Sequence, residues 1–84
     1  MTQEFTQDNF TADVIEASKN KPVLVDFFAS WCGPCQIQAP IVDEISEDMG
    51  DKAVVGKLNT ENAMDVARQY GIMSIPTIIV FRNG

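Results

Sequence analysis

The segment VLVDFFA, residues 23–29, is the feature that most restricts the fold of this chain. It is a nearly continuous apolar run of strand-forming residues, which is typical of a central strand covered on both faces. Its one polar residue is Asp26. With 84 residues the chain has room for one domain and one core, so any sheet built around this strand must belong to that core.

Helical and strand-like patterns alternate around this run. Apolar residues at helical spacing predict three helices, over about 9–19, from the second cysteine to near Gly50, and over about 63–70. Residues 53–59 and 77–82 read as strands, and a short strand is expected before the first helix. This alternation implies an α/β sheet with right-handed crossovers between parallel strands. Pro40 lies inside the long helix and is expected to kink it.

Charge and composition exclude several classes of function. Twelve acidic and six basic residues give a net charge of -6, which repels nucleic acid and anionic lipid. The absence of histidine removes Cys-His and Ser-His catalysis and the usual imidazole metal ligand. The start MTQEFTQDNF lacks the basic and apolar parts of a signal peptide, and no apolar stretch is long enough for a bilayer, so we expect a cytoplasmic protein.

The two cysteines stand in WCGPC, at the expected start of the long helix. Cys32 would sit at the helix N-terminus, partly exposed, where free N–H groups favour the thiolate, with Cys35 one turn later on the same face. Gly33 gives the loop conformational freedom and Pro34 suits the first helical turn. Cys32 could then attack a partner's disulfide to form a mixed disulfide, and Cys35 could displace the reduced product. A zinc half-site or a structural crosslink are the alternatives, but zinc requires four ligands and this chain has two thiols.

Two charged residues lie in otherwise apolar strands. A buried Asp26 would titrate above a free aspartate and could accept the proton of Cys35, whereas the alternative is an aspartate that points to water. Lys57 could pair with that carboxylate or extend outward. Trp31 is expected to shield the dithiol and to offer a contact surface.

The last expected strand is preceded by a proline and followed by an Asn-Gly pair. X-Pro bonds are cis in about one case in twenty, so sequence physics alone predicts a trans bond before Pro76. Asn83 and Gly84 follow the strand as a hairpin signal, because both tolerate the positive φ of a type I′ turn, and a frayed terminus is the alternative.

Several of these segments together resemble the thioredoxin family. The resemblance rests on VLVDFFASWCGPC, on the AP that follows the second cysteine, and on YGIMSIPTIIVFRNG. It implies a thioredoxin-like α/β fold, a central mixed sheet flanked by helices in the order βαβαβαβ. The family's final strand and helix have no counterpart in residues 1–84, which are therefore expected to form a single, C-terminally truncated domain.

The resemblance also implies a role for each matching residue. Cys32 corresponds to the attacking thiol, Cys35 to the resolving thiol, Asp26 to the buried carboxylate and Lys57 to its neighbour. The implied substrate-binding positions are Trp31, Gly33, Pro34, Ile75 and Pro76, the last being the family's cis-proline.

The family activity implied is reduction of protein disulfides, without a bound cofactor other than the redox-active Cys32–Cys35 disulfide. The resemblance implies that thioredoxin reductase, an NADPH-dependent flavoprotein, recharges the dithiol. This chain departs from the family at Gln36, where a cation is frequent, and at Phe28, where tryptophan is common.

The alternative, from a different class of function, is a redox-inactive thioredoxin-like binding module or fragment that binds partners without turnover. The last strand is also expected to be an exposed edge, which favours self-association.

Overall fold

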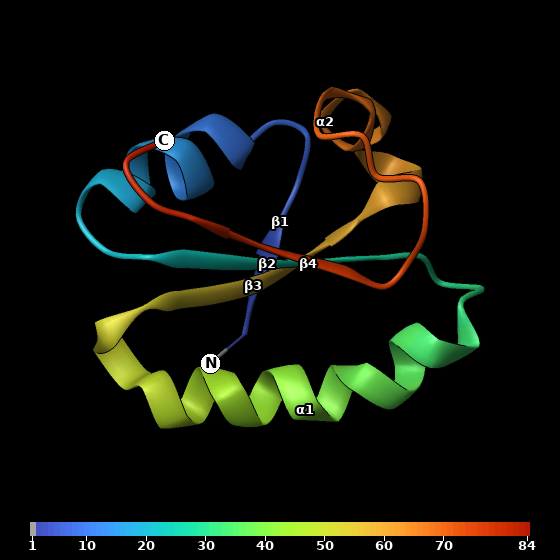
Figure 1. Cartoon of the computed structure of the whole chain (residues 1–84), viewed down its shortest axis with the longest axis horizontal. Coiled ribbons are helices and arrows are strands. Elements are labelled where there is room, and N and C mark those ends of the chain that lie inside the picture. The colour runs from blue at the N-terminus through green and yellow to red at the C-terminus, as the bar shows by residue number, and fades with distance from the viewer. Residues whose placement is uncertain (1) are drawn as a thin grey trace.

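The computed structural model describes residues 2–84, which form a four-stranded mixed sheet between two layers of helices (Figure 1). The strand order is β1-β3-β2-β4; β3 pairs in parallel with β1 and β2, whereas β4 is antiparallel to β2. The strands are β1 (Gln3–Phe5), β2 (Val23–Phe28), β3 (Val54–Asn59) and β4 (Thr77–Phe81). The central position and double coverage predicted for residues 23–29 are confirmed.

One face of the sheet carries α1 and the other carries η1, η2 and α2 (Figure 1). The helices are η1 (Thr11–Glu16), η2 (Ala17–Lys19), α1 (Gly33–Met49) and α2 (Met64–Gln69), with short 3-10 turns η3 (Gly50–Lys52) and η4 (Thr60–Asn62). The predicted first helix has the expected extent, but it is a π-helical segment followed by a 3-10 turn. No helix among residues 2–84 is long and apolar enough to cross a membrane.

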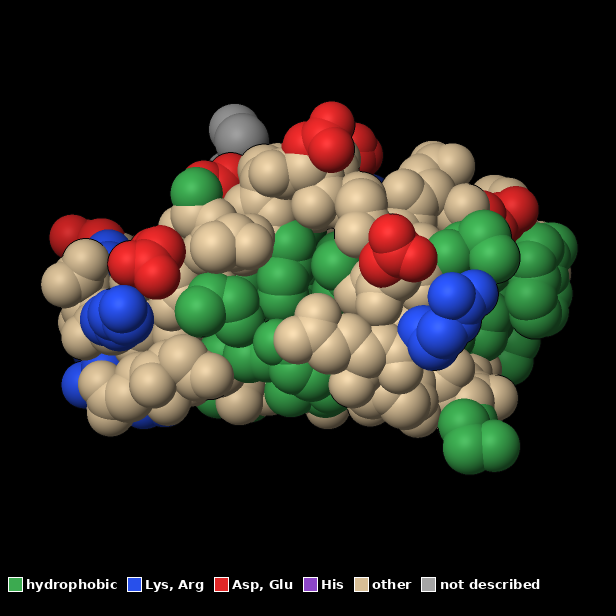
Figure 2. All heavy atoms as spheres, turned by 90° about the horizontal axis from the view of Figure 1, so that it is seen from above, with side chains coloured by type: hydrophobic (Ala, Val, Ile, Leu, Met, Phe, Trp, Pro, Cys, Tyr) green, Lys and Arg blue, Asp and Glu red, His purple; other side chains and the backbone are tan. Residues whose placement is uncertain are grey.

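The main core lies between the sheet and the η1/α2 layer. Phe27, Leu58 and Val14 are fully buried there. Phe10, Tyr70 and Phe81 close the end of this core as an aromatic triangle, with ring centroids 5.2–5.7 Å apart in tilted and edge-to-face arrangements. Seen from above in Figure 2, hydrophobic side chains show through the middle of this layer, with charged side chains around them.

Helix α1 runs without interruption through Pro40. In Figure 1 its first turns are set at an angle to the remainder, as expected for a helix with an internal proline. The helix ends where Gly50 adopts a positive φ of 57°, a conformation that glycine adopts at little cost. The first turns, which carry the cysteines, are thereby directed past the end of β2.

Strand β1 can approach β3 closely because position 56 is a glycine. A Cβ built there would lie 2.9 Å from the Gln3 carbonyl oxygen and would overlap the Phe5 ring. The ring of Phe5, which is 2% exposed, occupies the space that a side chain at Gly56 would need.

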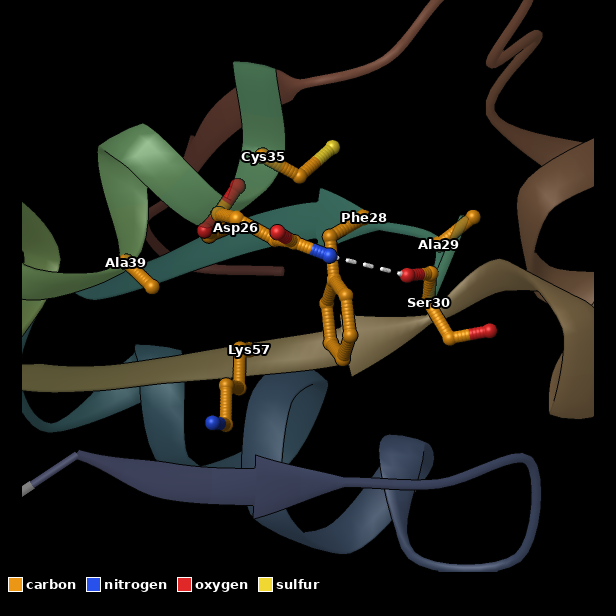
Figure 3. Close-up of a pocket in the computed structure, with 8 residues that line it drawn as sticks. Asp26, Phe28, Ala29, Ser30, Cys35, Ala39 and Lys57 are labelled. Atoms are coloured by element: carbon orange, nitrogen blue, oxygen red, sulfur yellow. Dashed lines mark hydrogen bonds between the residues drawn. The ribbon is translucent and has the colours of Figure 1, made fainter. Parts of the chain in front are cut away.

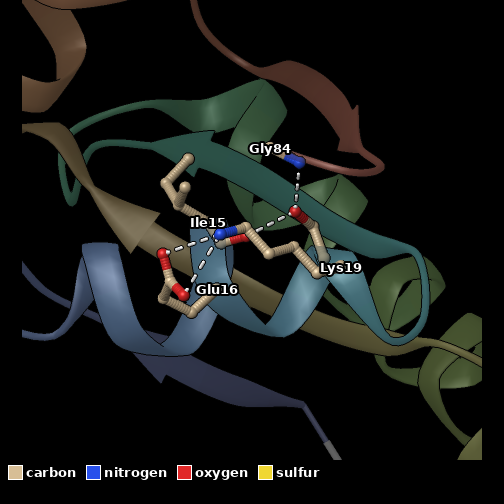
Figure 4. A network of polar contacts seen from close by, with 5 residues as sticks. Ile15, Glu16, Lys19 and Gly84 are labelled. Atoms are coloured by element: carbon tan, nitrogen blue, oxygen red, sulfur yellow. Dashed lines mark hydrogen bonds and ion pairs between the residues drawn. The ribbon is translucent and has the colours of Figure 1, made fainter.

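The end of β4 is anchored to η2 through Ser18 (Figure 4). The fully buried Ser18 hydroxyl donates to the Ile15 carbonyl at 2.6 Å and accepts from the Gly84 amide at 2.8 Å, and the Ser18 carbonyl accepts from the Asn83 amide at 2.8 Å. Asn83 and Gly84 have the positive φ values, 59° and 82°, that the hairpin signal predicts. The alternative of a frayed segment is wrong for residues 83–84, because both amides are bonded.

A candidate dithiol active site

The two cysteines form a disulfide at the start of α1. Cys32 is the N-cap residue and Cys35 lies in the first turn, with their Cα atoms 5.2 Å apart. The Cys35 amide donates to Cys32 Sγ at 3.1 Å, and the Gln36 amide donates to the Cys32 carbonyl at 3.3 Å. The sulfur of Cys32 therefore accepts one of the N–H groups that the helix N-terminus leaves unpaired, an environment that favours a thiolate.

Both cysteines are buried in the disulfide form. Each is 3% exposed, within a small apolar cluster that includes Ala29, Phe28 and Ile75. The prediction of a partly exposed Cys32 is therefore wrong for this form, because its sulfur packs inward against these neighbours. Trp31, at 72% exposure, instead presents its ring to solvent beside the disulfide.

The segment before β4 supplies the other side of this cluster. Ile75 packs against the cysteine cluster, and the Ile75–Pro76 peptide bond is cis. The trans bond predicted from base rates is wrong, and the cis-proline implied by the family resemblance is confirmed. A base rate for X-Pro bonds contains no information on which neighbours a particular proline will contact.

The carboxyl of Asp26 is buried in β2, on the sheet face that α1 covers. Asp26 is 2% exposed, so the alternative of a solvated aspartate is wrong. Burial raises its pKa above the ordinary value of 3.8, while a hydrogen bond from Gln38 Nε2 to Oδ1 at 3.2 Å and the charge of Lys57 act in the opposite direction.

Lys57 is the register partner of Asp26 on β3, but the two side chains do not form an ion pair. Its Nζ lies 5.8 Å from the centre of the Phe28 ring, and in Figure 3 the side chain extends away from the Asp26 carboxyl. Lys57 thus acts on Asp26 through its charge at a distance, while its ammonium group faces an aromatic ring.

A pocket of about 110 Å³ connects the carboxyl with the disulfide (Figure 3). Its lining residues are Asp26, Phe28, Ala29, Ser30, Cys35, Gln36, Ala39 and Lys57. Asp26 and Cys35 therefore share one small cavity, whose volume is large enough to admit water. Within residues 2–84 no group of three or more His, Cys, Asp or Glu side chains could hold a metal ion.

Sequence reasoning missed two polar contacts at the site. Glu61 Oε1 accepts from the Ser30 amide at 2.9 Å and from the Ser30 hydroxyl at 2.7 Å, which ties the loop before Cys32 to the end of β3. Gln38 was missed as a partner of Asp26, although its position three residues after Cys35 places both on one helical face. For Ser30 and Glu61, 31 residues apart, the sequence carries no such signal.

Comparison with known proteins agrees with this geometry. The thioredoxin family model matches residues 1–84. Thioredoxin 1 of Synechococcus elongatus is 51% identical over 79 residues, which are 94% of this chain and 72% of that protein. Thioredoxin M-type of Chlamydomonas reinhardtii is 56% identical over 77 residues, 92% of this chain and 54% of that protein.

A third relative is the bifunctional thioredoxin reductase/thioredoxin of Mycobacterium leprae. It is 45% identical over 84 residues, which are 100% of this chain and 18% of that protein. With the family model matching throughout, and with its disulfide at the N-terminus of α1 beside a cis-proline, the chain belongs to the thioredoxin family of thiol-disulfide oxidoreductases.

Proposed function

We propose that residues 1–84 act as a single domain that reduces protein disulfides through Cys32 and Cys35. The observation that carries the proposal is the position of the Cys32 sulfur. It accepts a helix N-terminal amide, it is bridged to Cys35, and a buried carboxyl shares the adjoining pocket. These are the conditions for a stabilised attacking thiolate and a nearby base.

The reaction begins from the reduced dithiol. The Cys32 thiolate attacks one sulfur of a substrate disulfide, a mixed disulfide forms, and the other substrate sulfur leaves as a thiolate that takes up a proton. Asp26 then accepts the proton of Cys35, and the Cys35 sulfur attacks Cys32. The second substrate sulfur leaves, the Cys32–Cys35 disulfide forms, and two electrons have passed to the substrate. Lys57 stabilises the ionised Asp26 through its positive charge.

The substrate-binding surface is formed by residues on both sides of the disulfide. Trp31, Gly33 and Pro34 are exposed, and Ile75 and Pro76 are half-buried beside the cysteine cluster. An extended substrate segment would contact Trp31 on one side and the backbone around Ile75 on the other.

Thioredoxin reductase, an NADPH-dependent flavoprotein, is the proposed electron donor. The relative from Mycobacterium leprae, whose name gives both thioredoxin reductase and thioredoxin, supports this partnership. The roles that follow are electron transport and cell redox homeostasis, and the proposed location is the cytoplasm.

Self-association through β4 is also proposed. This strand pairs with β2 on one side and forms the edge of the sheet on the other, and it exposes Ile78 and Val80. Exposed apolar side chains on an edge strand favour pairing with another chain.

Reduction of insulin by a dithiol reductant tests the proposed activity. Cys32→Ser is expected to abolish catalysis to the level without protein, since no attacking thiolate remains, and Cys35→Ser is expected to accumulate the mixed disulfide. Catalysis by Cys32→Ser equal to the wild type would refute the mechanism. If the yield of captured partner is the same after both thiols are removed, and no turnover is found, the result would instead support a redox-inactive binding module.

A further inference from the structure

The side-chain amide of Gln38 is the direct polar partner of the buried carboxyl. Its Nε2 donates to Asp26 Oδ1 at 3.2 Å, and no other hydrogen bond to this carboxyl is found among residues 2–84. Gln38 lies in α1, three residues after Cys35, so one helix presents both the resolving sulfur and the amide to the same face of the sheet. The contact joins the helix to β2 beside the pocket that Asp26 and Cys35 share.

The charged groups around this contact are few and more distant. Across the sheet, Asp26 is in register with Lys57 of β3, which is in register with Glu4 of β1, while the neighbour on β4 is the apolar Ile78. From α1, Asp43 and Glu47 line a separate pocket together with Lys57. Lys57 therefore has several carboxylates in its surroundings, whereas Gln38 supplies the one hydrogen bond to the Asp26 carboxyl among the described residues.

We infer that Gln38 is a positioning residue for the proton transfer between Cys35 and Asp26, since it holds Oδ1 and supports the ionised carboxylate. This inference rests on the proposed function, in which Asp26 is the base for Cys35. Burial alone favours the protonated acid, which cannot accept a proton. A donated amide hydrogen bond favours the carboxylate and orients it, and because the amide is uncharged its effect is the same at every working pH.

Direct titration of Asp26 tests the inference without reference to activity. The carboxyl carbon of Asp26 would be followed by ¹³C NMR in the oxidised protein against pH. In Gln38→Met, which keeps the side-chain length but removes the donor, the titration midpoint is expected to move to higher pH. Gln38→Glu, which replaces the donor by a carboxylate, is expected to shift it in the same direction.

Gln36→Met is the matched control. Gln36 lies on the same helix and lines the same pocket, but its Nε2 donates to the Ser30 carbonyl at 3.3 Å and not to Asp26. Gln36→Met therefore removes an amide from the pocket without removing the contact, and the titration midpoint should shift less than in Gln38→Met. An unchanged midpoint in both Gln38 variants, with native folding verified by circular dichroism, would overturn the inference. An equal shift in Gln36→Met would also overturn it, since the effect would then not depend on contact.

The kinetic consequence separates this inference from the proposed function. The release of a Cys32 mixed disulfide should be severalfold slower in Gln38→Met at neutral pH, with its pH profile displaced to higher pH. In an Asp26→Asn background the same substitution should have no effect on this rate. Full activity of Cys32→Ser would refute the proposed function and leave the titration result standing. An active wild-type protein whose Asp26 titration midpoint is unchanged in both Gln38 variants would refute the inference alone.

Discussion

The Asp26 carboxyl shows how a single residue can serve chemistry at the expense of stability. It lies at the middle of β2, where its neighbours within the strand, Val25 and Phe27, are fully buried. An ionised carboxylate in this position loses most of its hydration. The hydrogen bond from the Gln38 amide and the distant ammonium group of Lys57 offset only part of that loss.

Asp26→Asn is therefore expected to stabilise the oxidised protein at neutral pH, by about 1–3 kcal/mol. The pKa of Asp26 is raised by folding, so its protonated form contributes stability that is complete below the ordinary value of 3.8 and is lost as pH rises through the higher value in the folded protein. The advantage of the asparagine should accordingly be present at neutral pH and disappear near pH 3. Urea unfolding at both pH values measures the stability difference between Asp26→Asn and the wild type. A stability gain of equal size near pH 3 would contradict its attribution to the ionised Asp26 carboxylate.

The loop between β2 and α1 is held by an element that lies far from it in the sequence. Glu61, in η4 after β3, accepts both hydrogen bonds that Ser30 donates, and Ser30 lies two residues before Cys32. Hydrogen bonds from the Ser30 hydroxyl and then from the Ser30 amide lower the pKa of Glu61 below its ordinary value of 4.5. The loop that presents Trp31 and Cys32 is thus fixed to the end of β3 by a carboxylate.

Glu61→Gln is expected to destabilise the protein at neutral pH, because a neutral amide oxygen is a weaker acceptor. The contribution of the Glu61 carboxylate is present above pH 4.5 and is lost as pH falls through its lower folded pKa, so wild type and variant should converge in acid. Urea unfolding across this range tests it. Glu44→Gln serves as the control, since Glu44 is an exposed carboxylate on α1 with no hydrogen bond found among the described residues. A difference that persists in strong acid would exclude the carboxylate as its source.

The pairing of β1 with β3 depends on the missing side chain at Gly56. Gly56→Ala should lower the free energy of unfolding by about 1–3 kcal/mol, because the new Cβ overlaps the buried Phe5 ring. Thermal or urea unfolding provides the measurement. Gly33→Ala is the comparison, since nothing lies within 4 Å of a Cβ at that position. Equal stability of Gly56→Ala and the wild type would mean that β1 can move away without penalty.

The elements could be predicted from the sequence because their signals are local. The apolar run at 23–29, the helical spacing after Cys35 and the stop at Gly50 each lie within a few residues of the structure that they specify. Contacts between elements were predicted less well. The interaction of Lys57 with Asp26 was left open, Cys32 proved buried, and the Ser30–Glu61 and Gln38–Asp26 bonds were missed, since each depends on how two distant segments pack.

At the scale of the whole molecule, the two faces of the sheet differ in how fully they are covered. The η1/α2 side encloses the main core, whereas β4 exposes Ile78 at 42% and Val80 at 59%. On α1, Ile37 and Ile41 are exposed at 74% and 54%. On the α1 side of the sheet, the uncovered apolar surface is therefore contributed by α1 and β4, and this is the region in which association between chains is expected.

Val80→Lys is expected to reduce association between chains, because a lysine on an edge strand opposes pairing with a second edge. Sedimentation velocity over a range of protein concentrations should show a concentration-dependent increase in mass for the wild type and a smaller one for the variant. Met64→Lys, at an exposed position on α2, is the control and should resemble the wild type. A wild-type protein that stays monomeric at all concentrations would contradict the proposed self-association.

The anchoring of β4 by Ser18 has a consequence for the dynamics of the molecule. Amide hydrogens at the end of a strand usually exchange rapidly with solvent, but those of Asn83 and Gly84 are bonded to the carbonyl and hydroxyl of one buried residue. Their exchange therefore requires residues 83–84 to detach from η2, two residues after Phe81 of the aromatic triangle. Two amides at the end of the described chain thus report, through their exchange rates, how often the segment after β4 leaves η2.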